Sequence, residues 1–270
     1  MATFTTASAL TAARSLDADA AAGRWRGPLH GVPYGVKDVI AVAGAPTTWG
    51  VKASVRRSFD EDATVVARLA AAGAVCVAKL ATGELAFDDV WWGGHTKNPW
   101  NIAQGASGSS AGPAAAVAAG GVPFALGTET QGSLVSPAAR CGATAVRPTP
   151  GLVPRTGVMQ LADSLDKVGP ICRYAADCAA VLDAVRGADG VDPAARDALL
   201  TDPASIDLAS LTVAVLPSAR AMVEPVVAAL RARGVRVIDR DLTYATPATD
   251  VATTILLAEG ASSFDYWIRR

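Results

Sequence analysis

The stretch "DEDATVVARLAAAGAVCVAKL", residues 60–80, is the part of this sequence that decides the fold class. Val65 and Leu69 follow the spacing of one helix face, and Gly73 is the residue type that commonly ends a helix. Residues 74–80 then form a short apolar run, which is typical of a buried strand. A helix followed directly by a buried strand is a repeating unit of α/β proteins.

Helices and strands alternate in the same way along the rest of the chain. Further strands are predicted within 27–42, 122–130, 144–157, 211–217 and 235–242. Helices are predicted at 13–23, 82–87, 110–121, 175–187 and 221–234, and from 253 to Arg270, with long loops at 91–109 and 128–142. We therefore expect one α/β domain over residues 1–270, with a mixed, largely parallel central sheet covered by helices on both faces. Residues 205–270 are expected to continue this sheet.

The composition excludes several classes of function. Hydrophobic residues make up 51% of the chain, charged residues 18%, and the net charge is −1, so no basic face for direct nucleic-acid binding is expected. The longest apolar run, residues 114–126, is interrupted by glycine and proline and has small side chains, which does not suit a membrane span. The N-terminal residues lack the basic start, apolar core and cleavage site of a secretory signal.

Cysteine and histidine are too sparse for a metal site. The four cysteines are scattered without a CxxC pair, and only two histidines are present, so we expect neither a zinc site nor a cofactor. Reduced thiols of this kind favour a cytoplasmic protein. These cysteines are Cys76, Cys141, Cys172 and Cys178.

Two loops rich in glycine and serine are candidates for a catalytic site. The first, "GASGSSAGPAAAVAAG" at 105–120, lacks the GK[ST] ending of a phosphate-binding loop, and the second, at 128–142, contains no GxSxG elbow. A Ser-His-Asp triad would have to use His30 or His95, both in glycine-rich loops. The residues alone leave this alternative open.

Lysine can also activate a serine if burial removes its proton. Lys37 lies in "YGVKDV", between Val36 and Val39 and after a tight Gly/Pro loop, which suits a desolvated base. The competing interpretation is a surface lysine beside Asp38 in a solvated turn, and this segment taken alone favours the surface interpretation.

The combination of these loops resembles the amidase signature family, the Ser-Ser-Lys amidohydrolases. The resemblance runs from about Arg26 to about Asp183, with weaker similarity as far as Phe264. Eight segments carry it in the family order: "GPLHGVPYGVKD", "TTWG", "DATVVARLAAAGAVCVAKL", "NPWN", "GASGSSAGPAAAVAAG", "FALGTETQGSLVSPAARCG", "VRPTPGLVPRTGV" and "LDKVGPICR".

The resemblance implies a role for three residues. Ser133 matches the nucleophile that attacks the amide carbonyl, Ser109 matches a bridging serine on a cis peptide, and Lys37 matches the buried base. The implied reaction passes the proton of Ser133 through Ser109 to neutral Lys37, forms an acyl-enzyme and returns the proton to the leaving amine.

The resemblance further implies an oxyanion hole made by backbone N–H groups. These belong to Thr130, Gln131, Gly132 and Ser133. Adjacent donors aimed at one oxygen stabilise the charge of a tetrahedral intermediate.

The chain departs from the family pattern beside the nucleophile. Many members have two glycines before it, where this chain has Gln131 and Gly132. Many also have an Asp and an Arg at the positions of Glu129 and Val135, so the usual Asp–Arg brace is absent and Glu129 is expected to brace the loop differently. We expect these changes to alter substrate fit rather than to remove activity.

Other side chains near the two loops have a structural and a functional interpretation. Ser107 and Ser136 are interpreted as loop hydrogen-bonding residues, and Ser110 as a residue that ties down the loop. Three tryptophans of the long loop, Trp91, Trp92 and Trp100, either wall an acyl site or pack under the loop.

The resemblance implies an amidase that cleaves the C–N bond of a small-molecule carboxamide, with no cofactor, metal, membrane or direct nucleic-acid partner. Family domains are usually longer, so the resemblance also implies that opening helices and late pocket segments of the family lie outside these 270 residues. Two alternatives remain: a truncated, non-catalytic amidase fragment, and an amidotransferase A-like subunit that acts on misacylated tRNA with partner subunits. A homodimer is left open.

Overall fold

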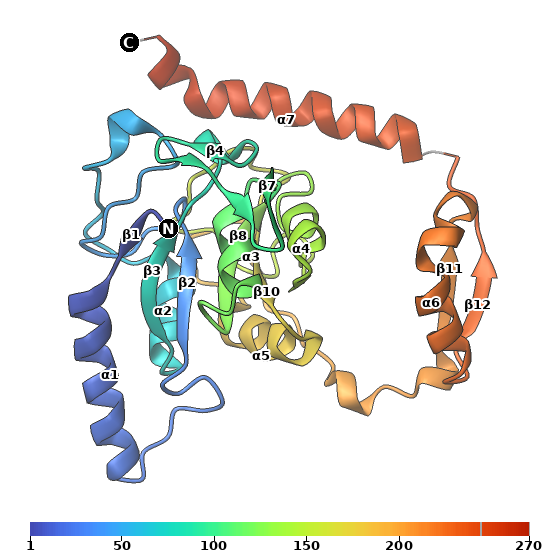
Figure 1. Ribbon diagram of the computed structural model, residues 1–270, viewed down its shortest axis with the longest axis horizontal. Helices are drawn as coiled ribbons and strands as arrows, with labels where there is room; N and C mark the ends of the chain where they lie inside the picture. Colours follow the sequence, from blue (N-terminus) through green and yellow to red (C-terminus); the bar gives the residue numbers. More distant parts are fainter. Residues whose placement is uncertain (244, 270) are drawn as a thin grey trace. The chain divides into compact units, whose positions relative to one another are not determined.

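The structure is a computed structural model that describes residues 1–243 and 245–269. Its main sheet has six strands in the order β1-β3-β2-β8-β10-β9 (Figure 1). Their bounds are β1 (Thr3–Phe4), β2 (Pro33–Lys37), β3 (Val75–Leu80), β8 (Phe124–Glu129), β9 (Thr144–Ala145) and β10 (Lys167–Cys172). The central strand β2 is parallel to β3 and β8, whereas β10 is antiparallel to β8 and β9, and β1 is antiparallel to β3. The predicted mixed α/β sheet is confirmed, and its parallel pairs are the central ones.

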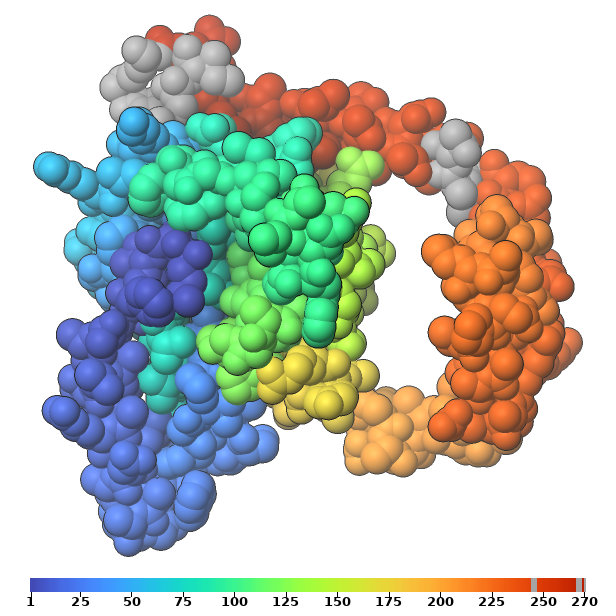
Figure 2. Space-filling view, viewed as in Figure 1, coloured from blue at the N-terminus to red at the C-terminus, as the bar shows by residue number. Residues whose placement is uncertain are grey.

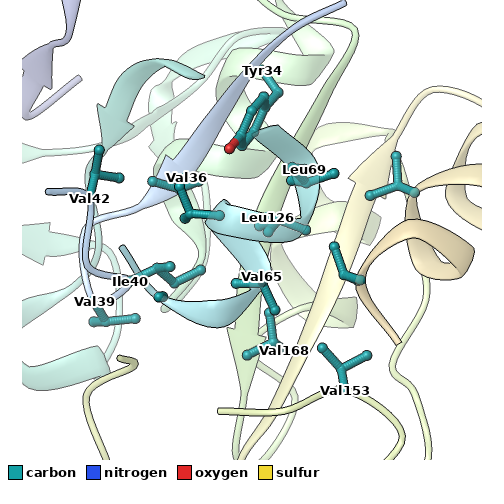
Figure 3. Close-up of a cluster of buried hydrophobic side chains, with 14 of the residues drawn as sticks. Tyr34, Val36, Val39, Ile40, Val42, Val65, Leu69, Leu126, Val153 and Val168 are labelled. Carbon is teal, nitrogen blue, oxygen red and sulfur yellow. The ribbon is translucent and has the colours of Figure 1, made fainter. Parts of the chain in front are cut away.

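Helices cover both faces of this sheet because successive residues of the buried strands point to opposite sides. Leu126 of β8 packs with Val65 and Leu69 in one apolar cluster (Figure 3), and its neighbour Ala125 packs with Val117 in another. The first cluster lies under α2 (Thr64–Ala71) and α5 (Ala175–Val185), and the second under α3 (Ala111–Ala118) and α4 (Val135–Cys141). A further helix, α1 (Thr6–Ala21), packs against β3.

The small side chains of α3 let this helix approach the sheet closely. The Gly112 N–H donates a hydrogen bond to the Ala81 carbonyl at 2.9 Å, directly after β3. Ala111 and Ala114 are fully buried in the second cluster. Closely packed alanine and glycine therefore fix the start of α3 against the ends of the central strands.

The two loops predicted to be long contain more regular structure than expected. Residues 91–109 include most of two short hairpins, made by β4 (Val90–Trp91) with β5 (Gly94–His95) and by β6 (Lys97–Asn98) with β7 (Asn101–Gly105). The space-filling view shows this segment, drawn in blue-green and green, on the surface (Figure 2). The prediction of a loop over 128–142 is wrong for residues 135–141, which form α4.

Short 3-10 turns complete the described elements. The helix predicted at 82–87 is reduced to one such turn, Glu84–Ala86, in which Leu85 has a positive φ of 50° that no regular helix contains. The others are Lys52–Ser54, Pro203–Ser205, Leu208–Ser210 and Pro217–Ala219.

A second compact unit comprises Leu199–Ile255, and the first unit resumes at Leu256. The second unit contains α6 (Arg220–Arg231), which contacts β12 (Arg236–Asp239). In the same unit, β11 (Thr212–Val215) and β12 pair in parallel with each other. They form a separate two-stranded sheet, although the sequence predicts that they continue the main sheet. The last helix, α7 (Ala245–Ile268), contributes residues to both units, and its predicted extension to Arg270 lies outside the described residues. No helix in the described residues is long and apolar enough to cross a membrane.

Candidate active site

Lys37 is buried at the end of β2, which overturns the surface interpretation of this residue. Its side chain is completely inaccessible to solvent. The Nζ atom lies 2.8 Å from Ser109 Oγ and 2.8 Å from Thr128 Oγ1, with the Thr128 carbonyl at 3.4 Å. Because β2 runs parallel to β8, the ends of both strands deliver Lys37 and Thr128 to the same edge of the sheet.

Burial changes the protonation of this lysine. Desolvation lowers the pKa of Lys37 from 10.5 to about 7, against the opposing attraction of the Asp166 and Glu129 carboxylates. A lysine with such a pKa is about half neutral at pH 7, so it can accept a proton there. The structure therefore places a group with the properties of a general base beside Ser109.

The loop before α3 holds two adjacent buried serines in different roles. The peptide bond between Gly108 and Ser109 is cis, as the family resemblance implies. Ser110 ties this loop to β8, because its hydroxyl donates to the Thr128 carbonyl at 3.0 Å and accepts from the Thr128 N–H at 3.2 Å. The Ser110 hydroxyl therefore bonds to β8, whereas the Ser109 hydroxyl contacts Lys37.

Ser133 lies in the turn between β8 and α4, next to the loop of Ser109. Its carbonyl accepts a hydrogen bond from the Ser110 N–H at 3.2 Å. The side chain is half-buried, and its hydroxyl has no hydrogen-bond partner among the described residues. The structure thus brings Ser133 to the loop that carries Ser109 and leaves its hydroxyl available.

Glu129 braces the Ser133 turn, as expected, through partners that the sequence did not identify. Its fully buried carboxylate accepts hydrogen bonds from the N–H groups of Leu134 and Val135 at 2.8 and 3.0 Å. These are the first free N–H groups of α4, where an anion is favoured. The second carboxylate oxygen has no hydrogen bond but lies 3.5 Å from the Arg147 guanidinium. Glu129 therefore replaces the Asp–Arg brace of the family with a cap on α4 and an ion pair to a different arginine.

The backbone before Ser133 has free N–H groups where an oxyanion hole is expected. Gly132 has a φ of 89°, a conformation that favours glycine. Among the described residues, the N–H groups of Gly132 and Ser133 have no hydrogen-bond acceptor. Thr130 and Gln131 precede them in the same turn, which directly follows β8.

Comparison with known proteins places this arrangement in a family. The amidase family model matches residues 1–268. The chain belongs to the amidase family. The A subunit of the glutamyl-tRNA(Gln) amidotransferase of Roseiflexus castenholzii is 40% identical, with 95% of this chain and 55% of that protein covered.

Solved amidase structures share the fold. The peptide amidase of Stenotrophomonas maltophilia superposes with a TM-score of 0.88 and 34% identity, covering 97% of this chain and 58% of that one. The A subunit of the glutamyl-tRNA(Gln) amidotransferase of Thermotoga maritima gives a TM-score of 0.82 and 30% identity over 89% of this chain and 57% of that one. The amidase-family chain thus spans little more than half the length of these relatives.

Neither histidine of this amidase-family chain contacts a candidate serine among the described residues. His30 bonds to the Leu16 carbonyl and to the Arg26 N–H, and His95 bonds to Asp89. The Ser-His-Asp alternative is therefore wrong for the described residues.

Two of the three tryptophans of the long loop donate hydrogen bonds to other segments of the chain. The Trp92 and Trp100 indoles donate to Thr48 Oγ1 and to the Cys141 carbonyl, at 3.1 and 2.7 Å, and Trp91 packs edge-on against Trp92. Ser107 and Ser136 bond to each other at 2.8 Å, which fits the structural interpretation of both.

A cavity of about 200 Å³ adjoins the Lys37 partner Thr128. Thr128, Thr130, Asp166 and Lys167 form its wall at the ends of β8 and β10. Apolar side chains complete much of the lining: Ala86, Val158, Met159, Leu161, Val168 and Val191. The three tryptophans are not among its lining residues, so the acyl-site interpretation of them has no support here.

Two residues of this site were missed in the sequence. Thr128 contacts Lys37, and Asp166 accepts a hydrogen bond from the Thr130 hydroxyl at 2.6 Å. Burial raises the pKa of Asp166 from its usual range. Thr128 stands two residues before Thr130 in the same strand-and-turn segment, which is a usable signal because alternate strand residues share a face. Asp166 has no such signal in the sequence, because it lies directly before β10 and is 36 residues away from Thr130.

A substitution at Gly108 tests how tightly the serine loop is confined. An alanine Cβ at this position would lie 1.8 Å from the Asp88 carbonyl oxygen. Gly108→Ala is therefore expected to destabilise the protein by about 1–3 kcal/mol and to reduce amide hydrolysis, because the loop must shift away from Lys37. Thermal unfolding and a steady-state assay measure both effects.

Gly260→Ala in α7 is the matched control. Its added Cβ would meet nothing closer than 3.4 Å, and alanine favours a helix over glycine by up to about 1 kcal/mol. Its melting temperature should stay the same or rise. Equal behaviour of the two variants would show that the Gly108 loop is not confined.

Proposed function

We propose that this protein hydrolyses a carboxamide C–N bond through an acyl-enzyme on Ser133. The observation that carries the proposal is the buried Lys37, whose pKa is about 7 and whose Nζ lies 2.8 Å from Ser109 Oγ. An exposed lysine at neutral pH would be protonated and could not serve as a base.

The contacts of Lys37 suit its neutral form. A neutral amine has two N–H donors and one lone pair. The oxygens of Thr128 provide acceptors for the N–H groups, so the lone pair is available to accept the Ser109 proton. Ser109 in turn accepts the proton of Ser133 as its oxygen attacks the amide carbonyl.

The rest of the reaction follows from the same groups. The C–O bond to Ser133 forms and the carbonyl oxygen becomes an oxyanion, which the N–H groups of residues 130–133 stabilise. The proton held at Lys37 returns through Ser109 to the amide nitrogen, and the C–N bond breaks to release the amine. Water then attacks the ester by the same route and releases the acid and Ser133.

The substrate in this proposal is a small-molecule amide whose acyl part enters the cavity beside Thr128. The peptide amidase of S. maltophilia has a similar fold over 97% of this chain, which supports a linear amide. No cofactor takes part in any step. The four free cysteines are typical of a reducing compartment, so we also propose a cytoplasmic location.

Covalent labelling tests the nucleophile. A fluorophosphonate probe reacts with activated serines, so we expect one equivalent of probe on Ser133, located by peptide mass spectrometry. Labelling should increase with pH through about 7, because Lys37 must be neutral. Ser136 is an internal comparison, since it lies three residues further on in α4 and its hydroxyl bonds to Ser107 rather than to a lysine among the described residues. A folded sample that never labels at Ser133 would contradict the proposal and favour the non-catalytic fragment.

An amidotransferase A-like subunit is the second candidate. The observation that favours it is 40% identity over 95% of this chain with a protein named as the A subunit of a glutamyl-tRNA(Gln) amidotransferase. Under this alternative the same Ser133 chemistry would release ammonia for a partner protein, and that partner would bind tRNA. Affinity purification from the source cells separates the candidates: stoichiometric partner subunits and tRNA-dependent amide hydrolysis would support the amidotransferase.

A further inference from the structure

Thr130 is the first residue of the turn that ends in Ser133. Its hydroxyl and its carbonyl both form hydrogen bonds to consecutive residues at the start of β10. Its hydroxyl donates to Asp166 Oδ1 at 2.6 Å, and its carbonyl accepts from Lys167 Nζ at 3.1 Å. We propose that Asp166, with Lys167 beside it, is a positioning residue that fixes the oxyanion-stabilising turn. This inference rests on the proposed function, because it assigns a purpose to the N–H groups of that turn.

Asp166 is itself held rigidly. Its other oxygen, Oδ2, accepts hydrogen bonds from the N–H groups of Leu161 and Ala162 at 2.7 and 3.0 Å. Three donors therefore converge on one carboxylate, and hydrogen bonds to an ionised group are stronger than neutral ones. The Asp166 carboxylate connects Thr130 to the 161–162 backbone as one unit.

The two ends of the turn are anchored by different carboxylates. Asp166 holds Thr130 at the start, and Glu129 holds the N–H groups of Leu134 and Val135 after Ser133. Only residues 131–133 lie between these anchors. Their N–H groups can move little while both anchors hold, which is what a preorganised oxyanion hole requires.

The same carboxylate reaches the substrate cavity. Thr130, Leu161, Asp166 and Lys167 all line it. Beyond Ala162, Ser164 donates through its N–H and its hydroxyl to the Glu259 carboxylate of α7, at 3.0 and 2.7 Å. Segment 161–164, from which Leu161 and Asp163 line the cavity, is therefore bonded to Asp166 at one end and to Glu259 at the other. Asp166 connects this segment to Thr130.

Paired threonine substitutions test the positioning role. Thr130→Val removes the hydroxyl at nearly constant size, and Thr130→Ser keeps it. We expect Thr130→Val to lower kcat by about 10-fold or more with KM changed less than about 2-fold, because a hydrogen bond to a charged group is lost and the N–H donors of the turn act mainly in the transition state. Thr130→Ser should recover most of that loss.

Asp166→Asn and a double variant test the partner. Asparagine has one carbonyl oxygen, so it cannot serve Thr130 and the two backbone N–H groups together. Asp166→Asn should lower kcat at least as much as Thr130→Val, and the double variant should be no worse than Asp166→Asn alone. Thr144→Val is the matched control, since Thr144 on β9 donates to the Arg173 carbonyl and lies outside the proposed site.

Hydrogen exchange gives a readout that does not depend on activity. Peptides covering 130–135 should exchange faster in Thr130→Val and in Asp166→Asn than in the wild type, and should not change in Thr144→Val. Unchanged exchange there, or equal loss of kcat in Thr130→Val and Thr130→Ser, would overturn the positioning role. If exchange is faster in these variants but the wild type hydrolyses no amide, the clamp on Thr130 stands and the proposed function fails.

Discussion

Ser133→Ala is expected to lower kcat for amide hydrolysis by about 10⁴-fold or more, since loss of a nucleophile removes the covalent route altogether. Stability should change by less than about 0.5 kcal/mol, because the Ser133 hydroxyl has no hydrogen-bond partner among the described residues. Binding of a competitive inhibitor should be unaffected, since the cavity wall does not include this side chain. Single-turnover kinetics, inhibitor titration and thermal unfolding measure the three quantities.

Ser136→Ala is the control for this substitution. Ser136 is exposed, lies three residues along the same segment and bonds only to Ser107 among the described side chains. The Ser136→Ala variant should hydrolyse the substrate at a rate close to that of the wild type. Residual hydrolysis by purified Ser133→Ala at a comparable rate would show that Ser133 is not the nucleophile.

Lys37→Met is expected to lower kcat/KM by about 10²- to 10⁴-fold, the usual contribution of a general base. Methionine fills a similar buried volume without an ammonium group. Combined with Ser133→Ala it should cause little additional loss, because the two residues act in one proton path. Lys52→Met, at an exposed position, is the matched control and should remain active.

The pH dependence separates Lys37 from a merely structural lysine. Because its pKa is about 7 in the folded protein, kcat/KM of the wild type should fall about tenfold per pH unit below that value as the base becomes protonated. This limb should be absent from the residual activity of Lys37→Met. A wild-type profile with no limb near pH 7 would contradict the assignment of Lys37 as the base.

The free energy of unfolding should also depend on the protonation of Lys37. Folding lowers the pKa of Lys37 from 10.5 to about 7, so the unfolded chain binds more protons between these values. The free energy of unfolding of the wild type, relative to Lys37→Met, should therefore rise with pH across this window, by up to about 1.4 kcal/mol per pH unit. Below pH 7 the full cost of burying the charge is present. Denaturant unfolding of both proteins at pH 7 and pH 10 measures the difference.

Local pattern predicted β2, β3 and β8 of the central sheet, but it did not predict β10 or the short edge strand β1. The spacing of Val65 and Leu69 predicted α2, and the apolar run that follows predicted β3, because both patterns depend only on neighbours in the chain. Pattern failed at α4, since a helix of seven residues that begins beside glycine and serine has no long apolar face to reveal it. It also failed for β11 and β12, whose strand pattern does not show which strand each will pair with.

By itself, the sequence determined which residues were candidates: Lys37, Ser109 and Ser133, through the resemblance of their segments to the amidase signature family. Only the tertiary structure decided that Lys37 is a buried amine rather than a surface cation, because its pKa depends on the strands and carboxylates packed around it. Tertiary structure also brought Asp166 to Thr130 across 36 residues of chain, and placed the Glu129 carboxylate at the first N–H groups of α4. Contacts of this kind form between segments that are distant in sequence, so no local pattern contains them.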